Sequence, residues 1–219
     1  EHYIYTDEFK PDKSVHDIDI NLSNVYYLYA KCLASMNKIE QAEKAFKVSL
    51  NYNPINIKAY LSFSDFYASQ GDYDSCLEKL QKALQYAYLP EELAECYIYY
   101  GLLYADIGRF NEAIALVCYS KAVKETVLID AALLYIENEL GSIPVIPDMD
   151  KIRKIMDEED ISGWPSPSVL NTAYSLGRYS FDNQNYWLSL FCFDIVRYYY
   201  RTDKVVKEYH EKVKAILNK

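Results

Sequence analysis

The side chains that could perform catalysis or bind a metal are scattered along the chain. Its thiols and imidazoles are Cys32, Cys76, Cys96, Cys118, Cys192, His2, His16 and His210. The sequence contains no CxxC pair and no close cluster of cysteine and histidine, which a zinc site requires. Each cysteine lies in an apolar run that is predicted to be helical, where a free thiol behaves as a small hydrophobic side chain. We therefore expect no metal ion.

Three further patterns in the sequence bear on possible chemistry. The acidic run 157–160 could bind a cation, but such runs are usually solvated loops, and the tyrosine run 198–200 is more typical of core packing than of a ligand cage. The chain has 6 glycines, and they do not form a loop of the kind that cradles phosphate. We expect no catalytic residues and no cofactor, so an enzyme is the class of protein that the sequence favours least.

Composition and charge narrow the classes of partner. The chain has 219 residues and a hydrophobic share of 51%, which is ordinary for a folded protein and excludes wholesale disorder. Its net charge of -9 argues against nucleic acid, which requires clustered lysine and arginine. No run of about 20 apolar residues occurs, so no membrane span is expected.

Free cysteines in apolar runs suggest a reducing compartment, and the predicted location is the cytoplasm. The chain begins at Glu1 rather than at a methionine, so the sequence leaves open an upstream export signal or a further domain.

The elements that would position any binding residue follow a period of 34 residues. Pairs at this spacing are Tyr26 and Tyr60, Tyr29 and Phe63, Ala30 and Ser64, and Ala42 and Cys76. A period near 34 indicates stacked helix-turn-helix units. Within the first unit a helix is predicted after Asn21 or Ser23 as cap, with a buried stripe formed by Val25, Tyr26, Tyr29, Ala30 and Leu33. A second helix over 39–52 should end at Pro54, because proline cannot continue the hydrogen-bond ladder.

The pattern resembles the tetratricopeptide repeat (TPR) family, in which bulky and small residues occupy fixed repeat positions. The matching residues of the first two units are Tyr26, Tyr29, Ala30, Leu33, Ala42, Phe46, Ser49 and Pro54, then Tyr60, Phe63, Ser64, Tyr67, Cys76, Leu80 and Ala83. Those of two later units are Tyr97, Tyr100, Gly101, Tyr104 and Ala113, then Leu176, Gly177, Ser189, Phe193 and Val196. The last unit departs from the pattern at Ala173 and Ser180, where bulk is expected.

The resemblance implies an all-α fold, a right-handed α-solenoid of antiparallel helix pairs. Residues 1–20 are predicted to be an arm or the remnant of an earlier element, and 21–219 a single solenoid. Its clear units are expected over 23–56, 57–90, 94–123 and 170–202, with an irregular, degenerate helical pair over 124–169 and a capping helix over 203–218. An alternative is two subdomains joined at about 145–168.

The resemblance also implies where a ligand would bind. In the family, the first helices of successive units line a concave groove through repeat positions 2, 5, 9 and 12. The candidate peptide-binding residues are Asn24, Tyr27, Lys31, Lys58, Leu61, Asp65, Ile98, Asn171, Tyr174 and Arg178. This lining mixes aromatic, amide and charged groups, which suits an extended or helical peptide. The basic clamp with which some members grip a terminal carboxylate is absent.

These observations favour a protein-interaction scaffold that binds a protein or peptide segment of unknown identity. One alternative is the peptide-sensing part of a larger regulator whose effector domain lies outside this chain. Another is a self-associating module, a homo-oligomer, which the aromatic density of 186–200 motivates.

Overall fold

The computed structural model describes residue 10 and residues 20–218 of the chain, which form two compact units joined at Gly163 and Trp164. The large unit contains the described residues 20–163, and the small unit contains 164–218. The predicted N-terminal arm, with His2 and His16, lies outside the described residues except for residues 10 and 20. The junction falls inside the segment 145–168 that the sequence marks as a connection.

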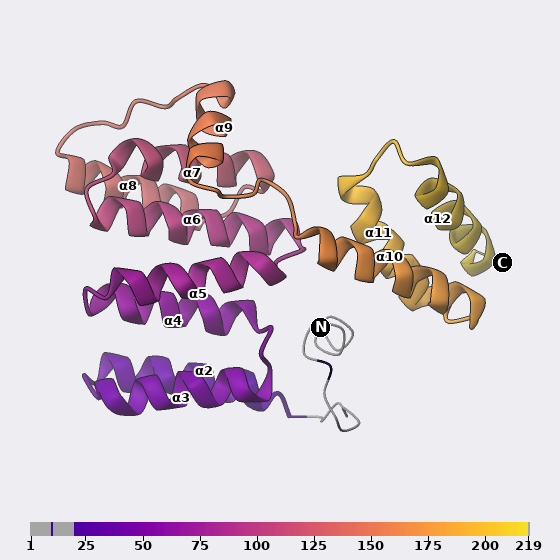
Figure 1. The fold of residues 1–219 in the computed structure, drawn as a ribbon, viewed down its shortest axis with the longest axis horizontal. Helices are drawn as coiled ribbons and strands as arrows, with labels where there is room; N and C mark the ends of the chain where they lie inside the picture. The colour runs from indigo at the N-terminus through magenta and orange to yellow at the C-terminus, as the bar shows by residue number, and fades with distance from the viewer. Residues whose placement is uncertain (1–9, 11–19, 219) are drawn as a thin grey trace. The chain divides into compact units, whose positions relative to one another are not determined.

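Throughout its described part the chain is helical, with no strand (Figure 1). The helices of the large unit are α2 (Leu22–Ser35), α3 (Ile39–Tyr52), α4 (Ile57–Ser69), α5 (Tyr73–Tyr86), α6 (Pro90–Asp106), α7 (Phe110–Val123), α8 (Leu128–Leu140) and α9 (Met149–Glu158). Those of the small unit are α10 (Pro167–Asp182), α11 (Tyr186–Tyr199) and α12 (Lys204–Leu217). None of these helices has the length and apolar character needed to cross a bilayer.

One turn geometry joins the two helices of each hairpin. The turn residues Asn37, Gly71, Gly108 and Gln184 all have a positive φ. In each case the next amide donates to a carbonyl five residues earlier, as from Lys38 to Leu33 at 2.9 Å. This is the Schellman arrangement, which satisfies the last carbonyls of one helix while turning the chain into the next. The same local geometry therefore closes each of these short hairpins.

The hairpins of the large unit stack on one another. Each first helix contacts the next, α2 with α4, α4 with α6 and α6 with α8, and each second helix contacts the following hairpin (Figure 1). Phe46 of α3 stacks on Phe63 of α4 with ring centroids 4.7 Å apart, which joins the first hairpin to the second. Ala30 and Ala42 are completely buried in the same cluster. The result is the neighbour-to-neighbour packing of a helical repeat.

The segment after the third hairpin differs from the predicted helical pair. Helix α8 packs on α6 and α7, and α9 packs on α7 rather than forming a closely packed pair with α8. Glu159, which follows α9, accepts hydrogen bonds from Tyr104 at 2.7 Å and from Arg109 at 2.9 Å. These polar contacts, together with the buried side chains of Ile152 and Met156, hold α9 on the third hairpin.

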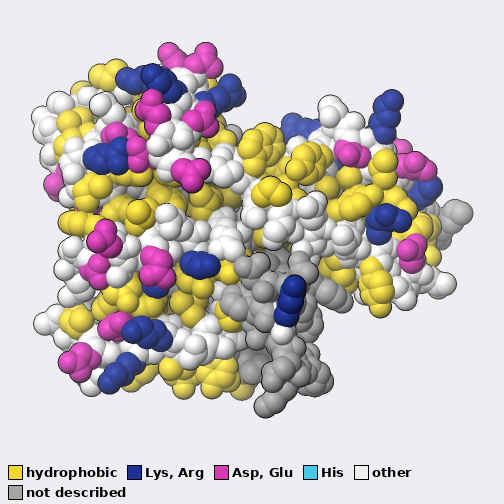
Figure 2. Space-filling view, in the orientation of Figure 1, with side chains coloured by type: hydrophobic (Ala, Val, Ile, Leu, Met, Phe, Trp, Pro, Cys, Tyr) yellow, Lys and Arg dark blue, Asp and Glu magenta, His cyan; other side chains and the backbone are white. Residues whose placement is uncertain are grey.

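The predicted buried stripe of the first helix is only partly correct. Val25 and Tyr29 are each 53% exposed, whereas Ala30 and Leu33 are buried. The reason is that no described helix covers this side of α2, since α3 and α4 lie on its other sides. Figure 2 shows hydrophobic side chains along this edge of the large unit.

The small unit contains one hairpin and a third helix. Phe193 and Val196 of α11 form a core with Val206 and Val213 of α12. Gly177 of α10 allows close approach to α11, because a Cβ there would lie 3.2 Å from Cys192 and from the Phe193 ring. Helix α12 coincides with the helix predicted over 203–218.

Candidate functional site

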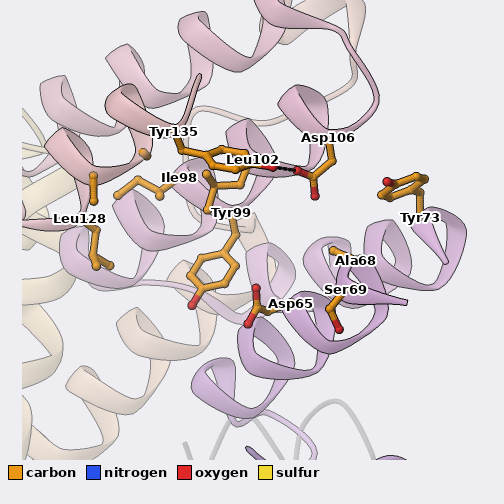
Figure 3. A pocket seen from close by; sticks show the side chains of 12 residues that line it. Asp65, Ala68, Ser69, Tyr73, Ile98, Tyr99, Leu102, Asp106, Leu128 and Tyr135 are labelled. Atoms are coloured by element: carbon orange, nitrogen blue, oxygen red, sulfur yellow. Dashed lines mark hydrogen bonds between the residues drawn. The ribbon is translucent and has the colours of Figure 1, made fainter. Parts of the chain in front are cut away.

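A cavity of about 630 Å³ opens on the side of the large unit that the first helices of the hairpins form. It lies among α4, α6 and α8, with Tyr73 from the start of α5 at one end (Figure 3). This volume is within the usual range of ligand sites, about 300–1,000 Å³. We call it the α4–α6–α8 cavity, and it is the strongest candidate site in the described part of the chain.

Each helix contributes a stripe of residues spaced three or four apart, which places their side chains on one face. The lining residues of α4, α6 and α8 are Asp65, Ala68 and Ser69, then Ile98, Tyr99, Leu102 and Asp106, then Leu128, Ala131, Ala132 and Tyr135. Small side chains at positions 68, 131 and 132 leave space that larger residues would fill. The cavity therefore follows from the alanines in the α4 and α8 stripes, which face the larger side chains of α6.

Two carboxylates supply the charge of the cavity. Tyr135 reaches from α8 and donates its hydroxyl to Asp106 Oδ1 at 2.6 Å (Figure 3). Asp65 is exposed, yet partial desolvation by the surrounding helices raises the pKa of its carboxyl, while the charge of Lys31 acts in the opposite direction. Burial also raises the pKa of Tyr99 to about 12, so its hydroxyl stays protonated and can donate near neutral pH. The cavity thus combines acceptor oxygens, hydroxyl donors and an apolar wall.

Two of the predicted binding residues line the cavity directly. Asp65 lies on its α4 side, and Ile98 forms part of the α6 wall although only 2% of its surface is exposed. Lys31 and Lys58 are exposed, and their charges lower the pKa of Asp65 and Glu95 respectively, against the upward effect of burial. These four predicted residues belong to the cavity or its charged surroundings.

Three other predicted residues of the large unit have structural contacts instead. Asn24 accepts a hydrogen bond from Asn56 Nδ2 at 3.0 Å, which links the first two hairpins. Tyr27 packs against the hydrophobic cluster that contains Ala30, Ala42 and Phe46. Leu61 is 3% exposed, so it offers almost no surface to a ligand.

The remaining predicted residues belong to α10 of the small unit. Asn171 is exposed, and Tyr174 makes an edge contact with Phe193 at a centroid distance of 6.2 Å. The Arg178 guanidinium lies 5.8 Å from the centroid of the Tyr209 ring on α12. Tyr174 and Arg178 thus have packing roles within the small unit.

Sequence reasoning missed Tyr99, Asp106 and Tyr135. Tyr99 and Asp106 lie one helix position away from those that the repeat pattern assigns to the groove, and Tyr135 lies in the irregular segment that this pattern does not cover. A usable signal existed in α8, where Leu128, Ala131, Ala132 and Tyr135 keep helical spacing. An amphipathic stripe of this kind predicts a face turned toward other residues or a ligand.

Among the residues that the structure describes, no group of three or more acidic, histidine or cysteine side chains could hold a metal ion. Burial raises the pKa of Cys76 to about 12 and that of Cys192 to about 11, so these thiols stay protonated and unreactive. The cavity can offer a ligand hydrogen bonds, ionic contacts and apolar contacts.

Comparison with known proteins adds no relative: no protein-family model matches the chain, and no curated protein matches it.

Proposed function

We propose that this chain is a non-enzymatic protein-interaction scaffold of the TPR type, and that the α4–α6–α8 cavity binds a segment of a partner polypeptide. The observation that carries the proposal is the cavity itself, which the first helices α4 and α6 and the following helix α8 line with side chains of mixed character. A repeat scaffold presents such a surface because each first helix adds one stripe to it. The 34-residue spacing and the repeated turn geometry support the TPR assignment and a right-handed solenoid.

The side chains of the cavity suit a peptide better than a rigid small molecule. An open hollow lined by Tyr73, Tyr99 and Tyr135 offers large contact area at low entropy cost, because tyrosine has few rotatable bonds. The alanines would admit one or two side chains of a bound segment. A helix or extended chain could then run along the first helices, as in other helix-in-groove and strand-like recognition.

Selection from a displayed library of random peptides, with the full chain as bait, tests the proposal. Ala131→Trp would fill the cavity at an exposed position, and Ala122→Trp adds the same bulk at an exposed position of α7 outside the lining. We expect selected peptides to bind wild type and Ala122→Trp alike and to lose most binding to Ala131→Trp. Equal binding to both variants, or no enrichment on wild type over Ala131→Trp, would contradict the proposal.

A further inference from the structure

The charged side chains that line the α4–α6–α8 cavity are all acidic. Its lining includes the carboxylates Asp65 and Asp106, and it contains no lysine, arginine or histidine. The two acids come from different helices, and the charge of Asp106 raises the pKa of Asp65, while the charge of Lys31, which lies outside the lining, has a larger effect in the opposite direction. A pair of like charges around one hollow is unfavourable unless a cation is brought between them.

The two carboxylates differ in how many hydrogen bonds they accept from other groups of the protein. Tyr135 donates a hydrogen bond to Asp106 at 2.6 Å, which occupies one of its oxygens. Asp65 has neither a hydrogen bond nor an ion pair with any other residue in the described ranges, and Lys31, whose charge it feels, is not part of the lining. The Asp65 carboxylate is therefore more available than that of Asp106 to accept hydrogen bonds from a ligand. The Asp106 carboxylate is a second acceptor, which the hydrogen bond from Tyr135 holds in position.

The remaining walls suit the rest of a basic side chain. Leu102 and Leu128 offer an apolar surface to the methylene stem of lysine or arginine. Tyr73 and Tyr99 add aromatic rings, which attract cations. A charged head and an apolar stem are the two parts of one long basic side chain, and the cavity has a counterpart for each.

We propose that the polypeptide segment bound by this cavity carries a lysine or arginine flanked by apolar residues, and that the basic head lies between the carboxylates of Asp65 and Asp106. This inference rests on the proposed function and adds the chemical class of the ligand to it. The net charge of -9 is consistent with a basic partner, because it favours encounter with cationic chains.

The test uses peptides selected on the full wild-type chain, synthesised with each lysine or arginine replaced in turn by norleucine. We expect one replacement to weaken binding, measured by fluorescence polarisation, about tenfold to a hundredfold, as loss of a hydrogen bond to a charged group does. Asp65→Asn should weaken the parent peptide similarly and leave the norleucine peptide unchanged. Asp130→Asn, at an exposed position of α8 outside the lining, is the matched control and should leave both peptides unchanged.

The outcomes separate the two proposals. Peptides that Ala131→Trp blocks but that lack an essential basic residue would overturn this inference and leave the scaffold function standing. Peptides that Ala131→Trp does not block would overturn both. Asp65→Asn and Asp106→Asn each keep a side-chain oxygen and similar volume, so helical content by circular dichroism should match wild type. If both bind the parent peptide at full strength, the inference is also wrong.

Discussion

A Cβ atom placed on Gly101 of α6 would lie 2.6 Å from Cγ2 of Val117 on α7, and 3.0 Å from the carbonyl oxygen of Ala113. The two helices of the third hairpin therefore approach each other closely at position 101, where glycine has no side chain. A side chain at position 101 can be accommodated only if Val117 changes rotamer or the helices separate.

We predict that Gly101→Ala destabilises the large unit by about 1–3 kcal/mol, because overpacking a close helix contact has that cost. The higher intrinsic helix propensity of alanine, worth roughly 1 kcal/mol, acts in the opposite direction and sets the lower end of the range. Urea unfolding followed by circular dichroism measures the difference. In a double-mutant cycle, Val117→Ala should relieve part of the cost, so the double variant should be more stable than the sum of the single effects requires. An unchanged unfolding midpoint for Gly101→Ala would show that the hairpin has room for a methyl group.

Tyr29 and Phe63 occupy equivalent repeat positions, but they should contribute differently to the free energy of unfolding. Phe63 is 1% exposed and stacks on Phe46, whereas Tyr29 is 53% exposed. We expect Phe63→Ala to cost about 3–5 kcal/mol, as buried aromatic truncations do. Tyr29→Ala should cost about 0.5 kcal/mol or less, as is usual for surface positions. Chemical denaturation of both variants measures this contrast, and equal costs would mean that other groups cover Tyr29 in solution.

The same pair shows what the periodic sequence could and could not predict. Alternation of small and aromatic residues specified which faces pack together, so the burial of Ala30, Ala42 and Phe63 followed from the period alone. Periodicity describes a residue's place within a unit, but burial also depends on whether a neighbouring unit is present. Tyr29 is exposed because the described structure has no helix on that side, and this information is not contained in the repeat pattern.

The cavity was predictable to a similar extent. Asp65 and Ile98 were identified because groove positions repeat from one first helix to the next. Asp106 and Tyr135 were not, because their hydrogen bond joins the end of α6 to a helix outside the regular repeats. Where a segment departs from the period, the neighbours of its side chains depend on tertiary packing, and spacing along the chain no longer reports them.

Glu159 should make the stability of the large unit depend on pH. Hydrogen bonds from Arg109 are the main cause that lowers the Glu159 pKa below its ordinary value of 4.5, with Tyr104 contributing and burial acting in the opposite direction. A lowered pKa in the folded state means that the carboxylate stabilises the fold above pH 4.5, and that this stabilisation disappears as the pH falls through the lowered pKa. We expect Glu159→Gln to cost about 1–2 kcal/mol at pH 7, because hydrogen bonds to a charged group are lost while Arg109 keeps partial access to water.

Urea unfolding of wild type and Glu159→Gln from neutral to acidic pH measures this dependence, and the difference between them should shrink as the pH falls below 4.5. Glu158→Gln is the matched control, because Glu158 has a longer contact of 3.7 Å with Lys154 and is 60% exposed. It should change stability by about 0.5 kcal/mol or less at every pH. A Glu159→Gln difference that stays constant across the titration would mean that the carboxylate charge has no part in holding α9.

His210 should hold α12 on α11 in the small unit. It is 2% exposed, and its ring lies between Asp194 Oδ1 at 2.7 Å from Nε2 and Arg197 Nη1 at 2.6 Å from Nδ1. Because Arg197 can only donate, Nδ1 must accept and Nε2–H must donate to Asp194, which is the neutral form of the ring. One buried side chain thus receives a hydrogen bond from α11 and returns one to it.

We predict that His210→Phe, which keeps a ring of similar size but removes both hydrogen bonds, destabilises the docking of α12 by about 1–3 kcal/mol. Hydrogen exchange followed by mass spectrometry should then show faster exchange in the 204–217 amides, while those of α2 to α7 remain as in wild type, because these helices belong to the other unit. Asp194→Asn is the control that retains an acceptor oxygen for Nε2–H, and it should have a much smaller effect. If His210→Phe leaves exchange in α12 unchanged, apolar packing of Val206 and Val213 is sufficient to hold this helix, and the hydrogen bonds across the buried imidazole add nothing measurable.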